Sequence, residues 1–281
     1  MVNENERRSK TLRRPIFMNI LIRGKFRSAY DKFLEGNAIY RGVKGSAAYP
    51  YWIVDPHKFY RKSRNTNNFY TGLIDRLPSW RNWPKRSRSI ICSTNPRNVS
   101  AYGHSMIVFP KNGSKIGICS EDDFWYSFPV VKKRLAMTVM SDFNYCFHKT
   151  FIDIDVKLGK LAETLNETNY DEFMNELQKI KVYDIVNKWV FANKRGTILK
   201  DMNENFDGDW ETYFDGLLNP QKNEMSLQTI ETFNPEYLDR EVWTDNLSLM
   251  VGSQYNTELR NSLSRIKIPP EPGEPNLDIE I

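Results

Sequence analysis

Apolar side chains recur at near-helical spacing in two parts of the chain. In residues 16–35 the pattern runs through Phe17, Leu21, Phe26, Tyr30, Phe33 and Leu34, and Gly36-Asn37 ends it. In residues 157–218 several short apolar stripes follow one another. These are Leu158, Leu161 and Leu165; Tyr170, Phe173 and Leu177; Val182, Ile185, Val186, Trp189 and Val190; and Trp210, Tyr213, Phe214 and Leu217. The spacing predicts a helix near the N-terminus and a group of helices over 157–218.

Shorter apolar runs, bounded by turn residues, predict strands. They cover residues 38–42, 89–94, 105–109, 115–119 and 247–252. The sequence Lys111-Asn112-Gly113 is a turn signal between two of these runs. Residues 104–119 are therefore expected to form a β-hairpin.

Helical and strand patterns together predict an α+β fold. We divide the chain into a basic N-terminal arm (1–15), a first part of an α+β core (16–156), a helical insertion or subdomain (157–218), a second part of the core (219–265) and a Pro-rich acidic tail (266–281). Residues 44–87 show little periodicity, so we expect long irregular segments there with short helices, such as one around 69–77.

Composition narrows the class of protein. The chain has 281 residues, 40% of them hydrophobic, which is enough for a packed core. No apolar run is long enough for a membrane-spanning helix or a signal peptide, so we expect a soluble, cytoplasmic protein, alone or associated with a larger particle. The three cysteines, Cys92, Cys119 and Cys146, lack metal-site spacing and are expected to be free, buried thiols. No metal site is expected.

Three short segments carry the candidate chemistry. Arg41-Gly42 ends one predicted strand, Ser93-Thr94 ends another, and Glu241 heads a later one. An arginine, a Ser-Thr pair and a glutamate in this order resemble the mono-ADP-ribosyltransferase superfamily, in its Arg–Ser–Glu branch. The resemblance covers about residues 20–125 and 225–255. It implies a split β-sheet core with a helical insertion, and the glycosyltransferase reaction of that family, in which NAD donates ADP-ribose to a macromolecular acceptor.

The resemblance gives each of these residues a role. Cleavage of the bond between nicotinamide and ribose builds positive charge on the sugar, as in glycoside cleavage. Arg41 would clamp a phosphate of the dinucleotide, and Gly42 would let NAD approach the backbone. Ser93, with Thr94 beside it, would bind the nicotinamide ribose and hold the glutamate in place. Glu241 would bind the ribose 2′-hydroxyl and stabilise the cationic transition state.

Two alternatives stay open within this hypothesis. Glu121, at the end of another predicted strand, is a second choice for the acid; Glu241 is preferred because a strand follows it directly. Asp239 stands where arginine-modifying family members carry a second glutamate and others carry glutamine. The acceptor, a protein or a nucleic acid, is therefore left open.

A basic segment, residues 58–97, supports a different class of function. It is rich in lysine and arginine, has Asp75 as its single acid, and contains interleaved aromatic residues. Basic side chains follow phosphates and exposed rings stack on bases. The alternative is thus a non-enzymatic nucleic-acid-binding protein, or a structural protein of a virion or other assembly that uses this segment and the charged termini. The segment could equally be a solvated loop whose aromatic residues lie in the core.

Overall fold

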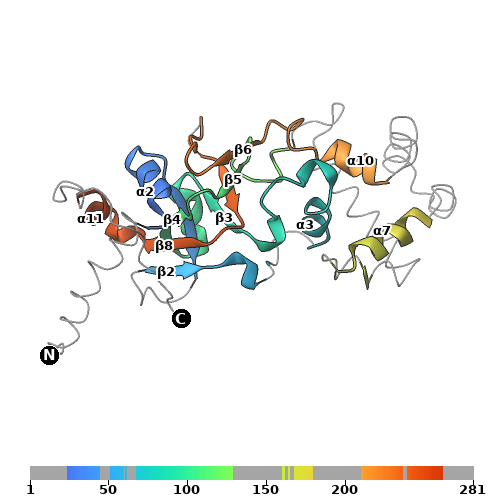
Figure 1. Ribbon diagram of the computed structural model, residues 1–281, viewed down its shortest axis with the longest axis horizontal. Helices are drawn as coiled ribbons and strands as arrows, with labels where there is room; N and C mark the ends of the chain where they lie inside the picture. Colours follow the sequence, from blue (N-terminus) through green and yellow to red (C-terminus); the bar gives the residue numbers. More distant parts are fainter. Residues whose placement is uncertain are drawn as a thin grey trace.

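The computed structural model describes residues 24–44, 51–59, 61, 68–128, 160–161, 164, 168–179, 210–236 and 239–261 (Figure 1). Its centre is one eight-stranded antiparallel sheet with the order β2-β8-β4-β1-β3-β7-β5-β6. The strands are β1 (Ile39–Val43), β2 (Tyr51–Val54), β3 (Ile90–Ser93), β4 (His104–Pro110), β5 (Lys115–Ile118), β6 (Ser226–Thr229), β7 (Glu241–Thr244) and β8 (Ser248–Gly252). The α+β class expected from the sequence is confirmed.

Six α-helices and several short 3-10 helices lie within the described residues. The α-helices are α2 (Arg27–Leu34), α3 (Asn68–Ile74), α4 (Pro96–Val99), α7 (Tyr170–Lys179), α10 (Trp210–Leu217) and α11 (Asn256–Asn261). The 3-10 helices are η1 (Pro56–Lys58), η2 (Pro78–Trp80), η3 (Arg86–Arg88), η4 (Ser100–Tyr102) and η5 (Ser253–Tyr255). The helix predicted over 16–35 is confirmed from Arg27 onward, and its first part lies outside the described residues.

The sheet is weakly joined in its middle. Strand β1 pairs with β4 along its whole length. Its pairing with β3, on the other side, is confined to Tyr40 opposite Ser93. The sheet therefore consists of two halves, β2-β8-β4-β1 and β3-β7-β5-β6, that share only a short stretch of ladder.

An aromatic cluster fixes helix α2 on the first half of the sheet. Tyr30 and Phe33 are fully buried, and their rings lie 6.2 Å and 5.6 Å from the ring of Phe109 in β4. The Tyr30 hydroxyl donates to the carbonyl of Leu259 in α11 at 2.6 Å, so the polar end of the ring is satisfied. Gly36 adopts φ +99° just after the helix, the left-handed conformation that glycine supplies at a helix C-terminus.

A second aromatic cluster packs against β7, in the other half of the sheet. The ring of Trp243 lies 5.8 Å from Trp83, 6.2 Å from Trp80 and 5.7 Å from Phe124. The indole N–H of Trp80 donates to the carbonyl of Leu218, directly after α10. This cluster therefore joins the sheet to the helical end of the molecule.

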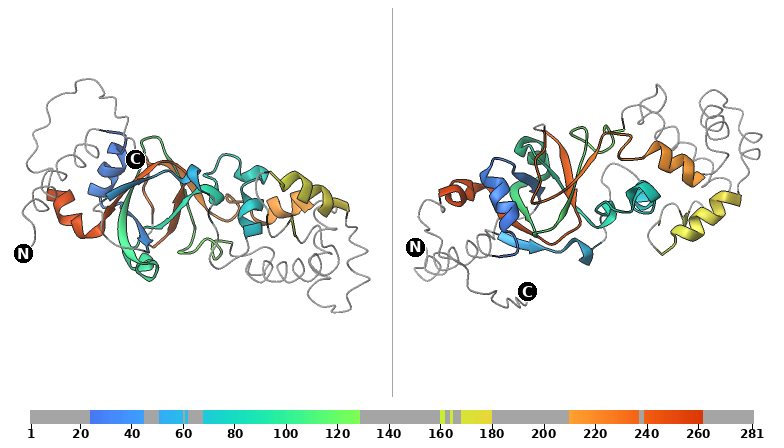
Figure 2. Two further views of the ribbon diagram at one scale, coloured as in Figure 1. Left: turned by 90° about the horizontal axis from the view of Figure 1, so that it is seen from below. Right: turned by 45° about the horizontal axis from the view of Figure 1, so that its top comes forward.

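Helices α3, α7 and α10 gather at that end, away from α2 and α11 (Figures 1 and 2). Helices α7 and α10 confirm two of the stripes predicted within 157–218, and α3 confirms the helix predicted around 69–77. The 182–190 stripe lies outside the described residues, and the 158–165 stripe is described only in part. Because α3 belongs to the first part of the chain, the helical end is built from more than one segment.

The predicted hairpin over 104–119 is wrong. Strands β4 and β5 both form where expected, but β4 lies between β1 and β8 while β5 lies between β7 and β6. The turn between them is held from outside: the N–H of Lys111 donates to Leu247 and that of Gly113 to the Glu231 carboxylate. An apolar pattern defines a strand and its buried face but not its partner.

The buried, free thiols expected at Cys92 and Cys119 are confirmed, and Cys146 lies outside the described residues. Burial raises the pKa of the Cys92 thiol to about 12. Across the part of the chain described above, no helix has both the length and the apolar character needed to cross a membrane.

Gly42 in β1 lies directly beneath the segment that contains α4 and η4. A Cβ at this position would lie 2.2 Å from the carbonyl oxygen of Val99 and 2.7 Å from the Cβ of Tyr102. We therefore expect Gly42→Ala to destabilise the protein by about 1–3 kcal/mol, the usual cost of overpacking, measured by urea unfolding. An unchanged unfolding midpoint would contradict this close approach.

Candidate functional site

The three strands that carry the predicted site residues are neighbours. Tyr40 of β1 lies opposite Ser93 of β3, and Ser93 lies opposite Glu241 of β7. Arg41 directly follows Tyr40. Since neighbouring strands are about 4.8 Å apart, the backbone of Arg41 and that of Glu241 are separated by on the order of 10 Å. The fold thus places Arg41, Ser93 and Glu241 on three adjacent strands, with Ser93 and Glu241 directly opposite each other and Arg41 one residue beyond the Tyr40–Ser93 pair.

Arg41 lies at the boundary between the two halves of the sheet. Its Nη1 donates to the carbonyl of Ile91 in β3 at 2.6 Å, across the stretch where the β1–β3 ladder is short. This bond uses one of the five N–H donors of the guanidinium. The half-buried side chain therefore has donors left for an anionic ligand.

Ser93 and Thr94 organise the turns on either side of the site. The Ser93 hydroxyl accepts from the N–H of Asn95 at 3.0 Å. The Thr94 hydroxyl accepts from the N–H groups of Asp239 and Arg240 at 3.0 and 2.8 Å. Thr94 therefore holds the turn that presents the next residue, Glu241.

Asp239 strengthens this turn in an uncommon conformation. Its φ is +84°, in the region that non-glycine residues seldom adopt. The Asn98 side chain donates to its carboxylate. The Asp239 carboxylate is thus committed to the turn.

Glu241 forms a buried ion pair. Its Oε1 lies 2.7 Å from Nη1 of Arg86, and the two side chains are 14% and 6% exposed. Its Oε2 accepts a longer bond, 3.4 Å, from the N–H of Phe124. The Arg86 guanidinium lies 3.8 Å from the ring centre of Phe124 and 4.9 Å from that of Trp243. The glutamate is therefore held against a cation between two aromatic rings.

Asp75 and Arg61 hold the backbone of Arg86 through hydrogen bonds. The buried Asp75 carboxylate accepts from the N–H of Arg86 at 2.6 Å and from that of Ser87 at 2.9 Å. Nε of Arg61 donates to the Arg86 carbonyl at 3.2 Å. Burial, and next the positive charge of Arg86, lower the pKa of the Arg61 guanidinium to about 10. Arg61 and Arg86 thus both lie near Glu241.

Gly42 has a different surrounding from the one expected. The space beside its α-carbon is filled by Val99 and Tyr102, so the close approach assigned to NAD is made by the protein's own chain. In this conformation Gly42 serves packing between β1 and the α4–η4 segment.

Glu121 was the second choice for the acid. Its backbone lies beside that of Glu241, but the two carboxylates have different surroundings. The Glu121 carbonyl accepts from the N–H of Glu241 at 3.3 Å. Its carboxylate is 56% exposed and lies 3.9 Å from Nη1 of Arg240. Of the two glutamates, only Glu241 has a carboxylate held within the protein by a buried cation.

Several aromatic and basic side chains of the segment 58–97 are buried. Trp80 and Trp83 are 1% and 5% exposed, so neither offers a ring face to a base. Arg86 is equally buried, while Arg81 and Arg97 are exposed. Of the aromatic residues that suggested stacking on nucleic acid, Trp80 and Trp83 instead form part of the core.

The sequence pattern missed Arg86, Asp75 and Phe124 as members of the site. Arg86 and Asp75 appeared only as members of a basic segment and its single acid. The signal in the sequence was that Asp75 is the single acid of the segment. A lone carboxylate among many cations is well placed to bind the basic residues or their backbone N–H groups. Comparisons with protein-family models, curated proteins and solved structures find no match to this chain.

Removal of the Thr94 hydroxyl tests the turn. In Thr94→Val the N–H groups of Asp239 and Arg240 lose their acceptor, which should cost about 1–3 kcal/mol in the free energy of unfolding measured with urea. The control Thr94→Ser retains the hydroxyl and should lose much less. Equal stability of the two variants would contradict the role of this hydroxyl.

The buried ion pair is tested by a double-mutant cycle. Arg86→Gln leaves the Glu241 carboxylate buried without its cation, which should cost about 3–5 kcal/mol. Adding Glu241→Gln to that variant removes the uncompensated charge and should restore part of the loss, as followed by urea unfolding. Strictly additive effects of the two changes would show that the pair is not coupled.

Proposed function

We propose that this chain transfers the ADP-ribosyl group of NAD to a macromolecular acceptor. The observation that carries the proposal is the register that sets Ser93 opposite Glu241, with Arg41 on the next strand. The order of these residues along the chain does not require them to lie on adjacent strands. Their adjacency is therefore support that is independent of the resemblance to the mono-ADP-ribosyltransferase superfamily. The short ladder between the two halves of the sheet agrees with the split core that this resemblance implies.

The proposed reaction breaks the bond between the nicotinamide nitrogen and C1 of its ribose. The bonding electron pair leaves with nicotinamide, which becomes neutral. A nucleophile of the acceptor then bonds to C1 and releases its proton. Glu241 would stabilise the positive charge on the ribose and accept a hydrogen bond from its 2′-hydroxyl, while Arg86 keeps the carboxylate in position.

The residues present fit NAD in charge and in hydrogen-bonding capacity. Arg41 would bind a phosphate with the donors that Ile91 does not use. Ser93 accepts a bond from Asn95 and can still donate its own proton to the ribose or to Glu241. Oε2 of Glu241 would exchange its 3.4 Å contact with Phe124 for a ribose hydroxyl. Because the Glu241 side chain is only 14% exposed, the segment around Phe124 would move to admit NAD.

The acceptor, a protein or a nucleic acid, is not specified by Asp239, whose carboxylate binds Asn98. The alternative of a non-enzymatic nucleic-acid-binding or assembly protein has less support, because Trp80 and Trp83 are buried and Arg86 pairs with Glu241. The charged termini, which that alternative also uses, lie outside the described residues.

Replacement of the acid tests the proposal. Glu241→Gln keeps the shape of the side chain and an oxygen that can accept from Arg86, but it removes the negative charge. We expect release of nicotinamide from NAD, and label transfer to a cell lysate, to fall by about 10²–10³-fold. NAD binding, measured by calorimetry, should change far less. Circular dichroism would verify that the variant is folded.

The matched control is Glu121→Gln, which should leave the rate nearly unchanged. Equal rates for wild type and Glu241→Gln would refute the catalytic role of Glu241, and a loss confined to Glu121→Gln would transfer that role to Glu121. No nicotinamide release by the wild-type protein, with water or with lysate as acceptor, would contradict the proposed function.

A further inference from the structure

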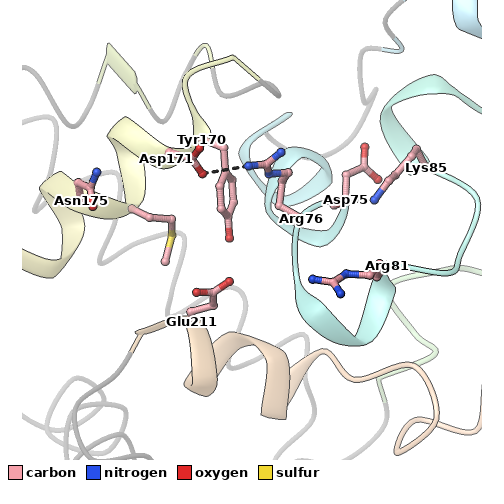
Figure 3. A pocket seen from close by; sticks show the side chains of 9 residues that line it. Asp75, Arg76, Arg81, Lys85, Tyr170, Asp171, Asn175 and Glu211 are labelled. Atoms are coloured by element: carbon pink, nitrogen blue, oxygen red, sulfur yellow. Dashed lines mark hydrogen bonds and ion pairs between the residues drawn. The ribbon is translucent and has the colours of Figure 1, made fainter.

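A cavity of about 580 Å³ lies at the helical end of the molecule, among α3, η2, α7 and α10 (Figure 3). It is lined by Asp75, Arg76, Arg81, Lys85, Tyr170, Asp171, Met174, Asn175 and Glu211. Its volume is within the range of small-molecule sites, roughly 300–1,000 Å³. None of the residues in the proposed transfer reaction lines it.

Tyr170 places an unsatisfied donor in this cavity. Its side chain is 4% exposed, and its hydroxyl has no hydrogen-bond partner within the described part of the chain. Figure 3 shows the hydroxyl pointing into the cavity toward Glu211. Burial raises the pKa of the phenol, so the group remains an O–H donor. A buried hydroxyl without a partner is costly, which indicates that a ligand supplies the partner.

The charged side chains that line the cavity are separated across it. The Asp75 carboxylate accepts from the N–H groups of Arg86 and Ser87, and Asp171 pairs with Arg76 at 2.9 Å. Figure 3 shows the cations of Arg81 and Lys85 on one side, with Glu211 and the Tyr170 hydroxyl across from them. Lys85 donates one bond to the Asp75 carbonyl and has two further N–H donors.

We propose that this cavity binds a sugar phosphate, free or as part of a mononucleotide. The phosphate would lie at Arg81 and Lys85, because a guanidinium fork and an ammonium group are the side chains that bind phosphate most strongly. The sugar hydroxyls would donate to Glu211 and accept from the Tyr170 O–H. The inference does not depend on the proposed transferase activity, since it uses other residues and a different ligand.

Isothermal titration of the 281-residue chain with ribose 5-phosphate and with AMP tests this site. We expect at least one of them to bind, and ribose or inorganic phosphate alone to bind more weakly. Arg81→Gln should weaken the binding by about 10–100-fold, because a charged hydrogen bond is lost. Tyr170→Phe should weaken it by about fivefold, the effect of one neutral hydrogen bond. Lys222→Gln, which removes an exposed charge outside the cavity, should leave the affinity unchanged.

Binding of ribose 5-phosphate without AMP would identify a free sugar phosphate, and binding of both would show that a base is admitted. Failure of both to bind at millimolar concentration, or affinities unchanged in Arg81→Gln and Tyr170→Phe, would overturn the proposal. Selective binding of an amino acid such as glutamate would likewise overturn it, in favour of a zwitterion site.

The unliganded proteins provide a further check. Tyr170→Phe keeps the ring, which lies 5.0 Å from the Arg76 guanidinium, and should melt at the same temperature as the wild type or higher. A clearly lower melting temperature would show that the hydroxyl has a partner within the protein and would remove the basis of the proposal. Because Arg81 is exposed, Arg81→Gln should fold normally. The affinity of this variant for ribose 5-phosphate and AMP therefore tests the site independently of the melting temperature of Tyr170→Phe.

Discussion

The buried ion pair between Arg86 and Glu241 is the contact on which the centre of this structure depends. Removal of two charges from water costs several kcal/mol for each ion, and their attraction offsets that cost only when both are well placed and hydrogen-bonded. Here Phe124 and Trp243 flank the cation, and Asp75 binds the backbone at residue 86. The pair therefore fixes the relative position of β7, the segment around Phe124 and the connection before β3.

The strands of the fold were largely predictable, whereas their arrangement was not. Alternation and turn residues placed β3, β4 and β5 nearly at their observed bounds, because both signals are local. The error at 104–119 arose because pairing is decided by non-local burial: β4 is covered on both faces and needs a partner strand on each side. Strand β2 went unpredicted because its residues lie within 44–87, a stretch with little periodicity, and pairing with β8 gives them their conformation.

The candidate site likewise has residues that the sequence could predict and residues that it could not. Arg41, Ser93 and Glu241 could be chosen from their order along the chain, and the register then brings them to neighbouring strands. The partner of Glu241 could not be chosen so, because nothing local distinguishes Arg86 from other arginines in a basic segment. Its role arises from burial between two rings that come from residues 124 and 243, far away in sequence. Gly42 shows the opposite error. The local sequence indicated a backbone open to a ligand, but Val99 and Tyr102 fill the space beside its α-carbon.

The basic segment has a structural explanation that net charge alone does not provide. Arg61 and Arg86 face the Glu241 region, whereas Arg81 and Lys85 face the cavity at the helical end. Asp75 stands between the two groups: its carboxylate binds the backbone of Arg86 and its carbonyl binds Lys85. Asp75 thus lines the cavity and also contacts Arg86, the partner of Glu241. Glu241 is thus connected to Asp75, at the edge of the cavity, through Arg86, whose guanidinium pairs with the Glu241 carboxylate and whose N–H donates to the Asp75 carboxylate.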